Sequence, residues 1–182
     1  MRPWWDPIRA VAGRSAMLTV VEIREATPDD WPALWPMLRR NAQAGETYTW
    51  PRDISEADAR TQWMKQAPGR TVVAADDDGT MLGTAYTRPN QDGPGDHVAN
   101  ASFLVDPAHS GRGVARALCQ HVLDRARADG YRAMQFNAVV ETNTRAVALW
   151  QSFGFEILTT VPEAFRHPTY GFVGLHVMYR RL

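Results

Sequence analysis

The chain has almost no cysteine, because Cys119 is the only one in 182 residues. An intrachain disulfide is therefore impossible, and a zinc site built from pairs of cysteines is excluded. Cys119 shares a helical stripe with Ala115 and Leu123. This placement predicts a small buried core residue rather than a catalytic thiol.

An excess of one charge is also lacking, because 20 basic side chains balance 20 acidic ones. Binding to nucleic acid or to an acidic membrane surface depends on clustered positive charge, so we expect neither partner. No apolar stretch is long enough to span a membrane, and residues 1–17 lack the apolar run of a secretory signal. We expect a cytoplasmic protein with an N-terminal extension at 1–18 and a single domain at 19–182.

What the sequence does contain is a glycine-bearing loop between a strand pattern and an amphipathic helix. An apolar segment ending at Val105 leads into residues 110–115, and the helical stripe that includes Leu118 follows. Gly111 and Gly113 let the backbone approach an anion, and the free amides of the helix start point to the same place. Glycine also occurs at helix starts for geometric reasons alone. The segment nevertheless predicts a phosphate cradle.

A second helix start follows the next predicted strand. From Asn143 the chain reads Asn-Thr-Arg-Ala-Val-Ala-Leu-Trp-Gln-Ser-Phe-Gly-Phe. Ala146, Leu149 and Trp150 fall at helical spacing, and Gly154 is placed to end the helix. Asparagine is well suited to cap such a helix. Two helix N-termini thus follow two successive strands.

These two segments together resemble the acyl-coenzyme A loop and the adjoining helix of the GNAT superfamily of N-acyltransferases. The resemblance extends over about residues 20–182, and within the superfamily the chain loosely resembles amino-acid-type acetyltransferases such as those acting on phosphinothricin. Two positions differ from the family pattern. Ser110 stands where the loop usually opens with glutamine or arginine. Trp150 stands where many members carry a tyrosine that protonates the departing thiolate, which indole cannot do.

The resemblance implies an α/β fold with acetyl-CoA as co-substrate. It implies one domain with a mixed, mostly antiparallel sheet, helices on both faces, and a central strand pair that splays apart to admit the pantetheine arm. An amide near Leu104 would face the oxygen that becomes negative, and loop amides would hold the pyrophosphate. No metal is expected. The expected cofactor-binding residues are Phe103, Leu104, Val105, Gly111, Arg112, Gly113, Val114, Ala115, Arg116, Asn143, Ala146 and Trp150.

Periodicity and turn residues predict the elements along the chain. Strands are predicted at residues 20–25, 71–75, 82–88, 97–105, 132–140, 155–161 and 173–180. Helices are predicted at residues 28–40, 55–66, 113–128 and 143–153. A long loop that holds Phe165, His167 and Tyr170 would join the last two strands.

Transfer of an acyl group requires an acceptor amine that has lost its proton before or during attack. Glu141 is the first candidate for the base because it closes a strand that borders the gap. Glu46 is the second, because its loop should cover the acceptor. Asp96 and His97 are further candidates, and each of the four suits a plain surface charge as well.

Protonation of the thiolate needs no dedicated acid, because a thiol pKa of about 8.5 lets water supply the proton at neutral pH. Tyr170, His167 or Tyr48 could also replace the tyrosine that is missing at Trp150. Tyr170 completes the catalytic set that we expect with the two glutamates.

Polar and aromatic side chains are the candidates for acceptor binding. Tyr48 lies in a loop that suits either a substrate lid or a surface loop folded onto the core. Asn100 and Asn137 lie on the strands that flank the gap, where they would bind a small polar acceptor or hydrogen-bond within the sheet. With His167 they form the expected substrate-binding set.

Three functions remain open at this stage. The main hypothesis is acetylation of a small-molecule amine, such as an amino acid or a toxic analogue. The others are modification of a protein or peptide amine, and binding or sensing of acyl-CoA without catalysis. The family likeness suggests a homodimer through the C-terminal strands, although residues 173–182 would read much the same in a monomer.

Overall fold

The computed structural model describes residues 21–182, so the extension expected at 1–18 lies outside the described residues. One seven-stranded sheet runs in the order β1-β2-β3-β4-β5-β7-β6 between two layers of helices. Its strands are β1 (Glu22–Glu25), β2 (Arg70–Ala75), β3 (Met81–Pro89), β4 (Val98–Val105), β5 (Ala133–Val140), β6 (Glu156–His167) and β7 (Gly171–Arg181). The α-helices are α1 (Trp31–Ala44), α2 (Glu56–Trp63), α3 (Val114–Ala128) and α4 (Thr144–Ser152).

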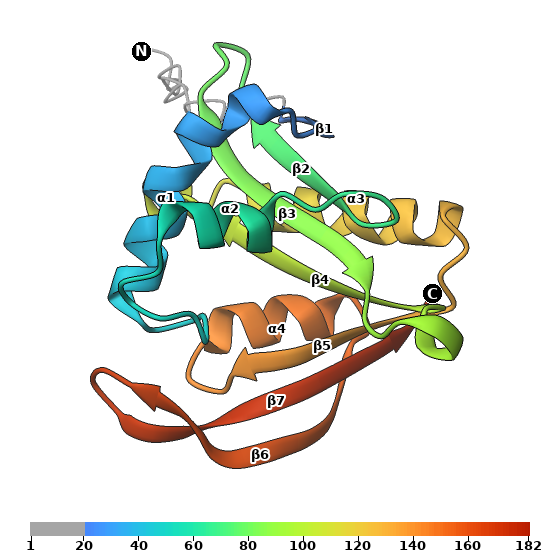
Figure 1. Cartoon of the computed structure of the whole chain (residues 1–182). Helices are drawn as coiled ribbons and strands as arrows, with labels where there is room; N and C mark the ends of the chain where they lie inside the picture. Colours follow the sequence, from blue (N-terminus) through green and yellow to red (C-terminus); the bar gives the residue numbers. More distant parts are fainter. Residues whose placement is uncertain (1–20) are drawn as a thin grey trace, which may run out of the picture.

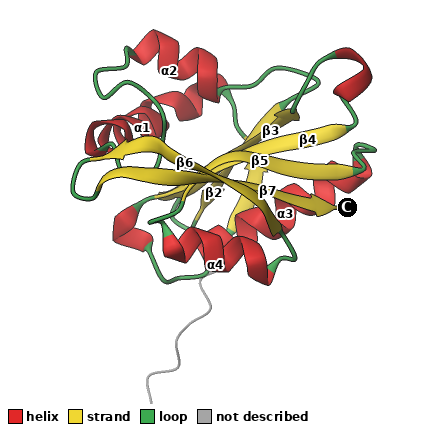
Figure 2. Ribbon diagram, turned by 90° about the horizontal axis from the view of Figure 1, so that it is seen from below, coloured by secondary structure: helices red, strands yellow, loops and turns green. Residues whose placement is uncertain are grey.

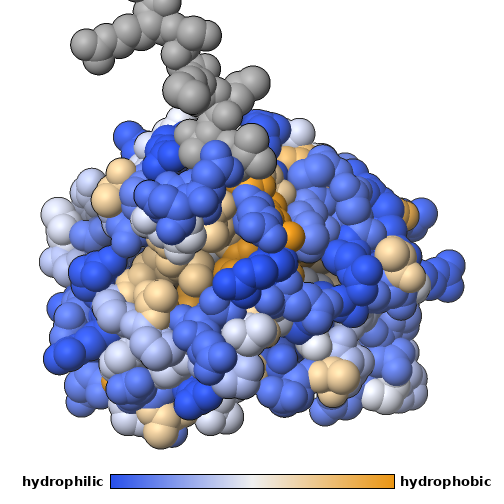
Figure 3. Space-filling model, turned by 90° about the horizontal axis from the view of Figure 1, so that it is seen from above, coloured by the Kyte–Doolittle hydropathy of each residue, from blue (hydrophilic) through white to orange (hydrophobic). Residues whose placement is uncertain are grey.

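The helices cover both faces of the sheet, as the sequence predicted. Figure 1 follows the chain through the sheet, and Figure 2 shows α1 and α2 on one side of it and α3 and α4 on the other. All strand pairs are antiparallel except that of β4 with β5. In the view from above, hydrophilic residues dominate the surface and hydrophobic ones gather near its centre (Figure 3). Among residues 21–182, no helix is long and apolar enough to cross a lipid bilayer.

The two N-terminal helices begin at capping residues that the sequence contains. The Thr27 backbone N–H donates to the Asp30 carboxylate at 2.7 Å in a short 3-10 turn before α1. Ser55 Oγ accepts from the Asp58 backbone N–H at 3.1 Å and caps α2. α1 continues four residues beyond the predicted end, to Ala44, and Gly45 follows as its C-cap with a positive φ of 63° that suits a helix terminus.

Each helix layer buries its own core against the sheet. On the α1/α2 face, Trp63 is fully buried, and its Nε1 donates to Thr84 Oγ1 at 3.0 Å. Thr84 Oγ1 in turn donates to the Val72 carbonyl at 2.7 Å, so both buried polar groups are satisfied. On the α3/α4 face, Cys119 is fully buried, and burial raises the pKa of its thiol to about 12. The prediction that Cys119 is a core residue is confirmed.

The central strands β4 and β5 separate after a short parallel contact. They pair only at Val98 with Ala133 and at Ala99 with Met134, although β4 continues to Val105. Asn100 Nδ2 donates to the Gln135 carbonyl at 2.8 Å, just where the ladder ends. A side-chain amide therefore replaces the next backbone bond, and the predicted splayed pair is confirmed.

The long loop predicted between the last two strands is wrong. β6 continues to His167 and pairs with β7 as far as Gly171, so residues 168–170 form a tight turn. Register shifts interrupt the pairing between Ile157 and Thr159 and between Val161 and Phe165. These irregularities break the simple alternation of apolar and polar residues on which the sequence prediction relied.

Candidate active site

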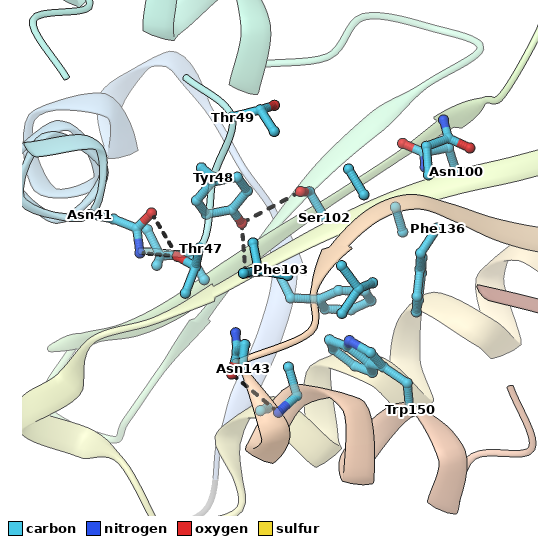
Figure 4. A pocket seen from close by; sticks show the side chains of 18 of the residues that line it. Asn41, Thr47, Tyr48, Thr49, Asn100, Ser102, Phe103, Phe136, Asn143 and Trp150 are labelled. Atoms are coloured by element: carbon cyan, nitrogen blue, oxygen red, sulfur yellow. Dashed lines mark hydrogen bonds between the residues drawn. The ribbon is translucent and has the colours of Figure 1, made fainter. Parts of the chain in front are cut away.

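A cavity of about 540 Å³ opens where β4 and β5 separate, and it connects the two faces of the sheet. Figure 4 shows it from close by, with Tyr48 above the strands and Trp150 below them. We call one side the α1/α2 half; its lining residues include Tyr48, Trp50, Tyr86, Arg88, Asn100 and Ser102. We call the other side the α3/α4 half; its lining residues include Ala115, Asn143, Arg145, Ala146, Leu149 and Trp150.

The register of β4 determines which backbone groups face the gap. The Asp106 N–H donates to Leu82 O and the Asn90 N–H donates to Val98 O, so the even-numbered β4 residues exchange bonds with β3. The backbone groups of Phe103 and Val105 consequently face the gap. The amide expected near Leu104 is therefore not that of Leu104 itself, whose carbonyl points toward Gly83 of β3.

The loop between α1 and α2 covers this gap. Tyr48 Oη donates to the Phe103 carbonyl at 2.7 Å, and Thr47 and Asn41 are hydrogen-bonded at the base of the loop (Figure 4). Burial raises the pKa of the Tyr48 phenol well above its ordinary value, so this phenol is a poor proton donor to a thiolate. The sequence-predicted place of Tyr48 in the loop over the gap agrees with the structure, and its hydroxyl fastens that loop to β4.

The N-terminus of α3 has the geometry of an anion cradle. Gly111 and Gly113 have positive φ values of 80° and 82°, and an added Cβ at either position would meet nothing within 4 Å. The first intrahelical bond runs from the Ala117 N–H to the Gly113 carbonyl, so the three amides of residues 114–116 point out of the helix. Open space, free amides and the helix dipole together suit a diphosphate.

A second cavity of about 300 Å³ lies over this cradle and adjoins the first. Val105, Ala115, Arg145 and Leu149 line both. The predicted loop residues Gly111, Gly113, Val114 and Arg116 line the second cavity too. Arg112 does not line it; its guanidinium lies 3.0 Å from His109 Nδ1 and 4.0 Å from the Asp76 carboxylate.

The start of α4 forms the opposite wall of the α3/α4 half. Asn143 Oδ1 accepts from the Ala146 N–H at 3.3 Å, which confirms the predicted cap. Trp150 is 7% exposed, and its ring lies 4.8 Å from Phe103 and 5.1 Å from Phe136 between centroids. The Trp150 indole therefore occupies the position at which the family resemblance led us to look for a tyrosine that faces the gap.

None of the four candidate bases, Glu46, Asp96, His97 and Glu141, lines either cavity. The Glu141 carboxylate accepts from the Gly174 N–H of β7, and Glu46 is exposed on the loop surface. In β5, a register shift between Phe136 and Val139 precedes the residues that join Glu141 to β7, so its carboxylate turns toward β7 and away from the gap. Of the residues in 21–182 that line the larger cavity, none is aspartate, glutamate or histidine.

Tyr170 and His167 also lie outside both cavities, because the predicted loop is a hairpin. Tyr170 is 66% exposed in the turn, and its ring lies 4.7 Å from that of His167. His167 is buried, and its Nδ1 accepts from the Thr169 N–H at 3.1 Å. The structure therefore places both away from the gap.

The two predicted asparagines do line the α1/α2 side of the gap. Asn137 Nδ2 donates to Asn90 Oδ1 at 2.7 Å, and Gln135 Nε2 donates to Asn137 Oδ1 at 2.8 Å. Asn100 is buried with its amide nitrogen bound to the Gln135 carbonyl. Hydrogen bonding within the sheet region is therefore confirmed for both, and binding of the acceptor by these residues stays a prediction.

Several lining residues were missed by sequence reasoning, above all Tyr86, Arg88 and Ser102. Tyr86 lies opposite Ser102 in the β3–β4 ladder, and Arg88 lies opposite Asn100. Cross-strand partners share one face of the sheet, so all of these residues face α1 and α2. The sequence did contain a signal for Arg88, since an arginine that alternates with buried residues in a strand indicates a specific role for its charge.

A mixed seven-stranded sheet that opens between two parallel central strands, beside a glycine-rich helix start, defines a class of fold that binds an acyl carrier across the opening. Sequence comparison identifies the family. Residues 23–155 match the model of the acetyltransferase (GNAT) family. The chain therefore belongs to the GNAT family of acetyl-CoA-dependent N-acetyltransferases, and the resemblance seen at residues 110–115 and 143–155 is confirmed.

Similar proteins are known in structure and in sequence. The GCN5-related N-acetyltransferase from Kribbella flavida is 55% identical, with a TM-score of 0.87 over 89% of this chain and 98% of that one. The L-amino acid N-acyltransferase MnaT of Escherichia coli is 27% identical over 117 residues, 63% of this chain and 67% of the relative. The aminoglycoside N(6')-acetyltransferase type 1 of Stenotrophomonas maltophilia is 32% identical over 139 residues, 74% and 85% of the two chains. The N-acetyltransferase aca1 of Schizosaccharomyces pombe is 32% identical over 100 residues, 55% of this chain and about half (48%) of the relative.

Proposed function

We propose that the protein transfers an acetyl group from acetyl-CoA to the amine of a small molecule, an amino acid or a toxic analogue of one, by direct attack on the thioester. The observation that carries this proposal is the cavity that connects the two faces of the sheet. Its α3/α4 half continues into the anion cradle, while its α1/α2 half is covered by the loop of Tyr48. Donor and acceptor would thus enter from opposite faces and meet at the gap.

The residues of the chain would divide the work between the two halves. When bound, acetyl-CoA supplies an acyl thioester whose carbonyl carbon accepts the amine nitrogen. The amides of residues 114–116 would hold the diphosphate, and the backbone of Phe103 and Val105 would align the arm along β4. The Val105 or Phe103 amide would donate to the carbonyl oxygen as it becomes negative. The Tyr48 loop would exclude water from the α1/α2 half.

The covered acceptor side favours a small molecule over a protein or peptide amine. Thr47, Tyr48, Thr49 and Trp50 all line the cavity, so the loop closes what would otherwise be an open groove. Because acetyl-CoA is a cytoplasmic metabolite, we place the reaction in the cytoplasm. An aminoglycoside acceptor is the second candidate, and the similarity to the Stenotrophomonas maltophilia enzyme favours it.

Thiol release tests the proposed reaction. Purified protein with acetyl-CoA should release free thiol with at least some amines from a panel of amino acids, polyamines, aminoglycosides and peptides. Mass spectrometry of the product should show a single added acetyl group. Tight binding of acetyl-CoA without turnover on any member of the panel would contradict the proposal and favour an acyl-CoA binding module.

We further propose that the protein is a homodimer joined through β6 and β7. The large apolar side chains exposed in residues 21–182 all lie on this hairpin: Ile157, Leu158, Val161, Tyr170 and Phe172. β6 is also an edge strand of 12 residues. Exposed apolar side chains on an edge strand and the strand beside it favour association with a second copy.

Phe172→Asp should therefore convert the dimer into a monomer, because it replaces an exposed apolar side chain of this hairpin with a charge. Light scattering after gel filtration measures the change directly. Gln43→Asp, on the exposed surface of α1, is the matched control and should stay dimeric. A wild-type protein that is monomeric at high concentration would refute the assignment.

A further inference from the structure

The α1/α2 half of the cavity has an uneven distribution of charge. Arg88 is the only charged side chain that lines this half among residues 21–182. The other arginine of the cavity, Arg145, lines the cavity over the anion cradle as well, so it belongs to the α3/α4 half. An acceptor that enters from the α1/α2 side therefore meets one positive group and no negative one.

Arg88 has a second cation beside it. Lys65 does not line the cavity itself, but its Nζ lies 5.0 Å from the centroid of the Tyr86 ring, which does. A Cβ added at Gly69 would lie 3.1 Å from Lys65 Cβ and 3.2 Å from Arg88 Cβ, so the two side chains leave the backbone close together. Burial first and then Arg88 lower the pKa of the Lys65 ammonium. Both side chains are half-buried. Like charges held together in a partly buried place are unfavourable unless an anion joins them.

Neither cation has an internal counterion. Within residues 21–182, no carboxylate lies within ion-pair distance of Lys65 or of Arg88. The Arg88 guanidinium donates one hydrogen bond, from Nη1 to the Pro89 carbonyl at 3.0 Å. Its other N–H groups have no protein partner in this part of the chain. An arginine in that state presents a fork of donors that suits a carboxylate.

We propose that Arg88, assisted by Lys65, forms an anion subsite that binds the carboxylate of the acceptor and disfavours polycationic amines. This inference rests on the proposed function and specifies its acceptor as an amine that carries an anionic group. Arg88 lies opposite Asn100 in the β3–β4 ladder, and Phe103 follows three residues later along β4. An anion held at Arg88 thus leaves the amine of a compact molecule directed along β4 toward the gap.

The aromatic walls of this half agree with an amino-acid acceptor. Tyr48 and Trp50 lie 5.6 Å apart, and Tyr86 lies 5.1 Å from Trp63, between ring centroids. Of these rings, Tyr86 carries a cation of the chain itself, Lys65. Tyr48 and Trp50, which line the cavity, would pack an apolar substituent of the acceptor.

The experiment compares amino acids with their own amides. We would measure kcat/KM for leucine and leucinamide and for phenylalanine and phenylalaninamide, each expressed per concentration of neutral amine, with spermidine and kanamycin as polycations. The wild type should prefer each acid over its amide by about 10- to 100-fold, through KM, because a charge-assisted bidentate contact is lost in the amide. Spermidine and kanamycin should be poorer still.

Variants of Arg88 and Lys65 test whether the preference for the acid over its amide comes from the subsite. Arg88→Gln should bring the acid-to-amide ratio close to one with little change for the amides, and Arg88→Lys should retain part of it. Lys65→Gln should lower the ratio less. Arg39→Gln, on the exposed surface of α1, is the charge-matched control and should keep the wild-type ratio.

The outcomes separate the subsite from the proposed function. If amides are acetylated as well as acids, or Arg88→Gln lowers both equally, the subsite is refuted while the acetyltransferase function stands. A kcat/KM for spermidine or kanamycin that is higher than that for every amino acid would likewise refute the subsite and leave the acetyltransferase function standing. If the protein binds acetyl-CoA but acetylates neither acids nor amides, the proposed function fails and the subsite fails with it.

Discussion

Replacing Gly113 with aspartate should raise the Kd for acetyl-CoA by at least about 100-fold, because a carboxylate would stand where the diphosphate binds. The Cβ at this position would point into open space beside the free amides of α3. The new charge would oppose the ligand charge and the helix would lose its anion site. Isothermal titration calorimetry measures the Kd, and thermal unfolding without ligand shows whether the fold persists.

Two further variants separate charge from backbone strain. Gly113→Asn has nearly the same shape, carries no charge and tolerates a positive φ, so it should weaken binding far less than the aspartate does. Gly130→Asp introduces the same residue at the other end of α3, where φ is 87° and an added Cβ also meets nothing within 4 Å. It should bind acetyl-CoA as the wild type does. Unchanged affinity in Gly113→Asp would remove the phosphate site from α3.

The parts of the fold that depend on neighbouring residues could be predicted from the sequence. The starts of α3 and α4 follow from a glycine with positive φ and from an asparagine cap, both of which act within one turn. The apolar stripe that buries Trp31, Leu34 and Leu38 follows from helical periodicity alone. These local signals also carry the family resemblance, so the cofactor side of the site could be anticipated.

The acceptor side could not be predicted, because it depends on contacts between distant segments. Arg88 reaches the cavity only because β3 pairs with β4 in one register, and nothing local specifies that register. Glu141 follows a strand that borders the gap, yet its carboxylate binds the Gly174 amide 33 residues away. A sequence shows which carboxylates are near the ends of strands but not toward which neighbour they turn.

The rate of acetylation should increase with pH across the neutral range, which is the largest effect that the charge of the cavity implies. No aspartate, glutamate or histidine lines the larger cavity among residues 21–182, so the amine must arrive already neutral. An aliphatic amine with a pKa of about 10.4 is protonated at neutral pH, and its neutral fraction increases about tenfold per pH unit. kcat/KM should therefore increase about 100-fold between pH 6 and pH 8.

The dependence of kcat/KM on pH above the neutral range tests how the departing thiolate is protonated. An acid that must be protonated would make the rate fall again at high pH. Indole does not titrate in this range, and burial raises the pKa of the Tyr48 phenol above its ordinary value. Water then protonates the thiolate, so kcat/KM should level off at the amine pKa without a descending limb below pH 10.

The same profile distinguishes this mechanism from the base predicted at Glu141. A carboxylate base in that place would accept the proton of a bound ammonium, so the rate would not depend on the neutral fraction of the amine, which predicts a flat profile from pH 6 to pH 8. In that case Glu141→Gln should lower kcat at least about 100-fold. If the amine arrives neutral, Glu141→Gln should instead keep the slope of the wild type, and any loss should appear in thermal stability, because the side chain holds the Gly174 amide of β7.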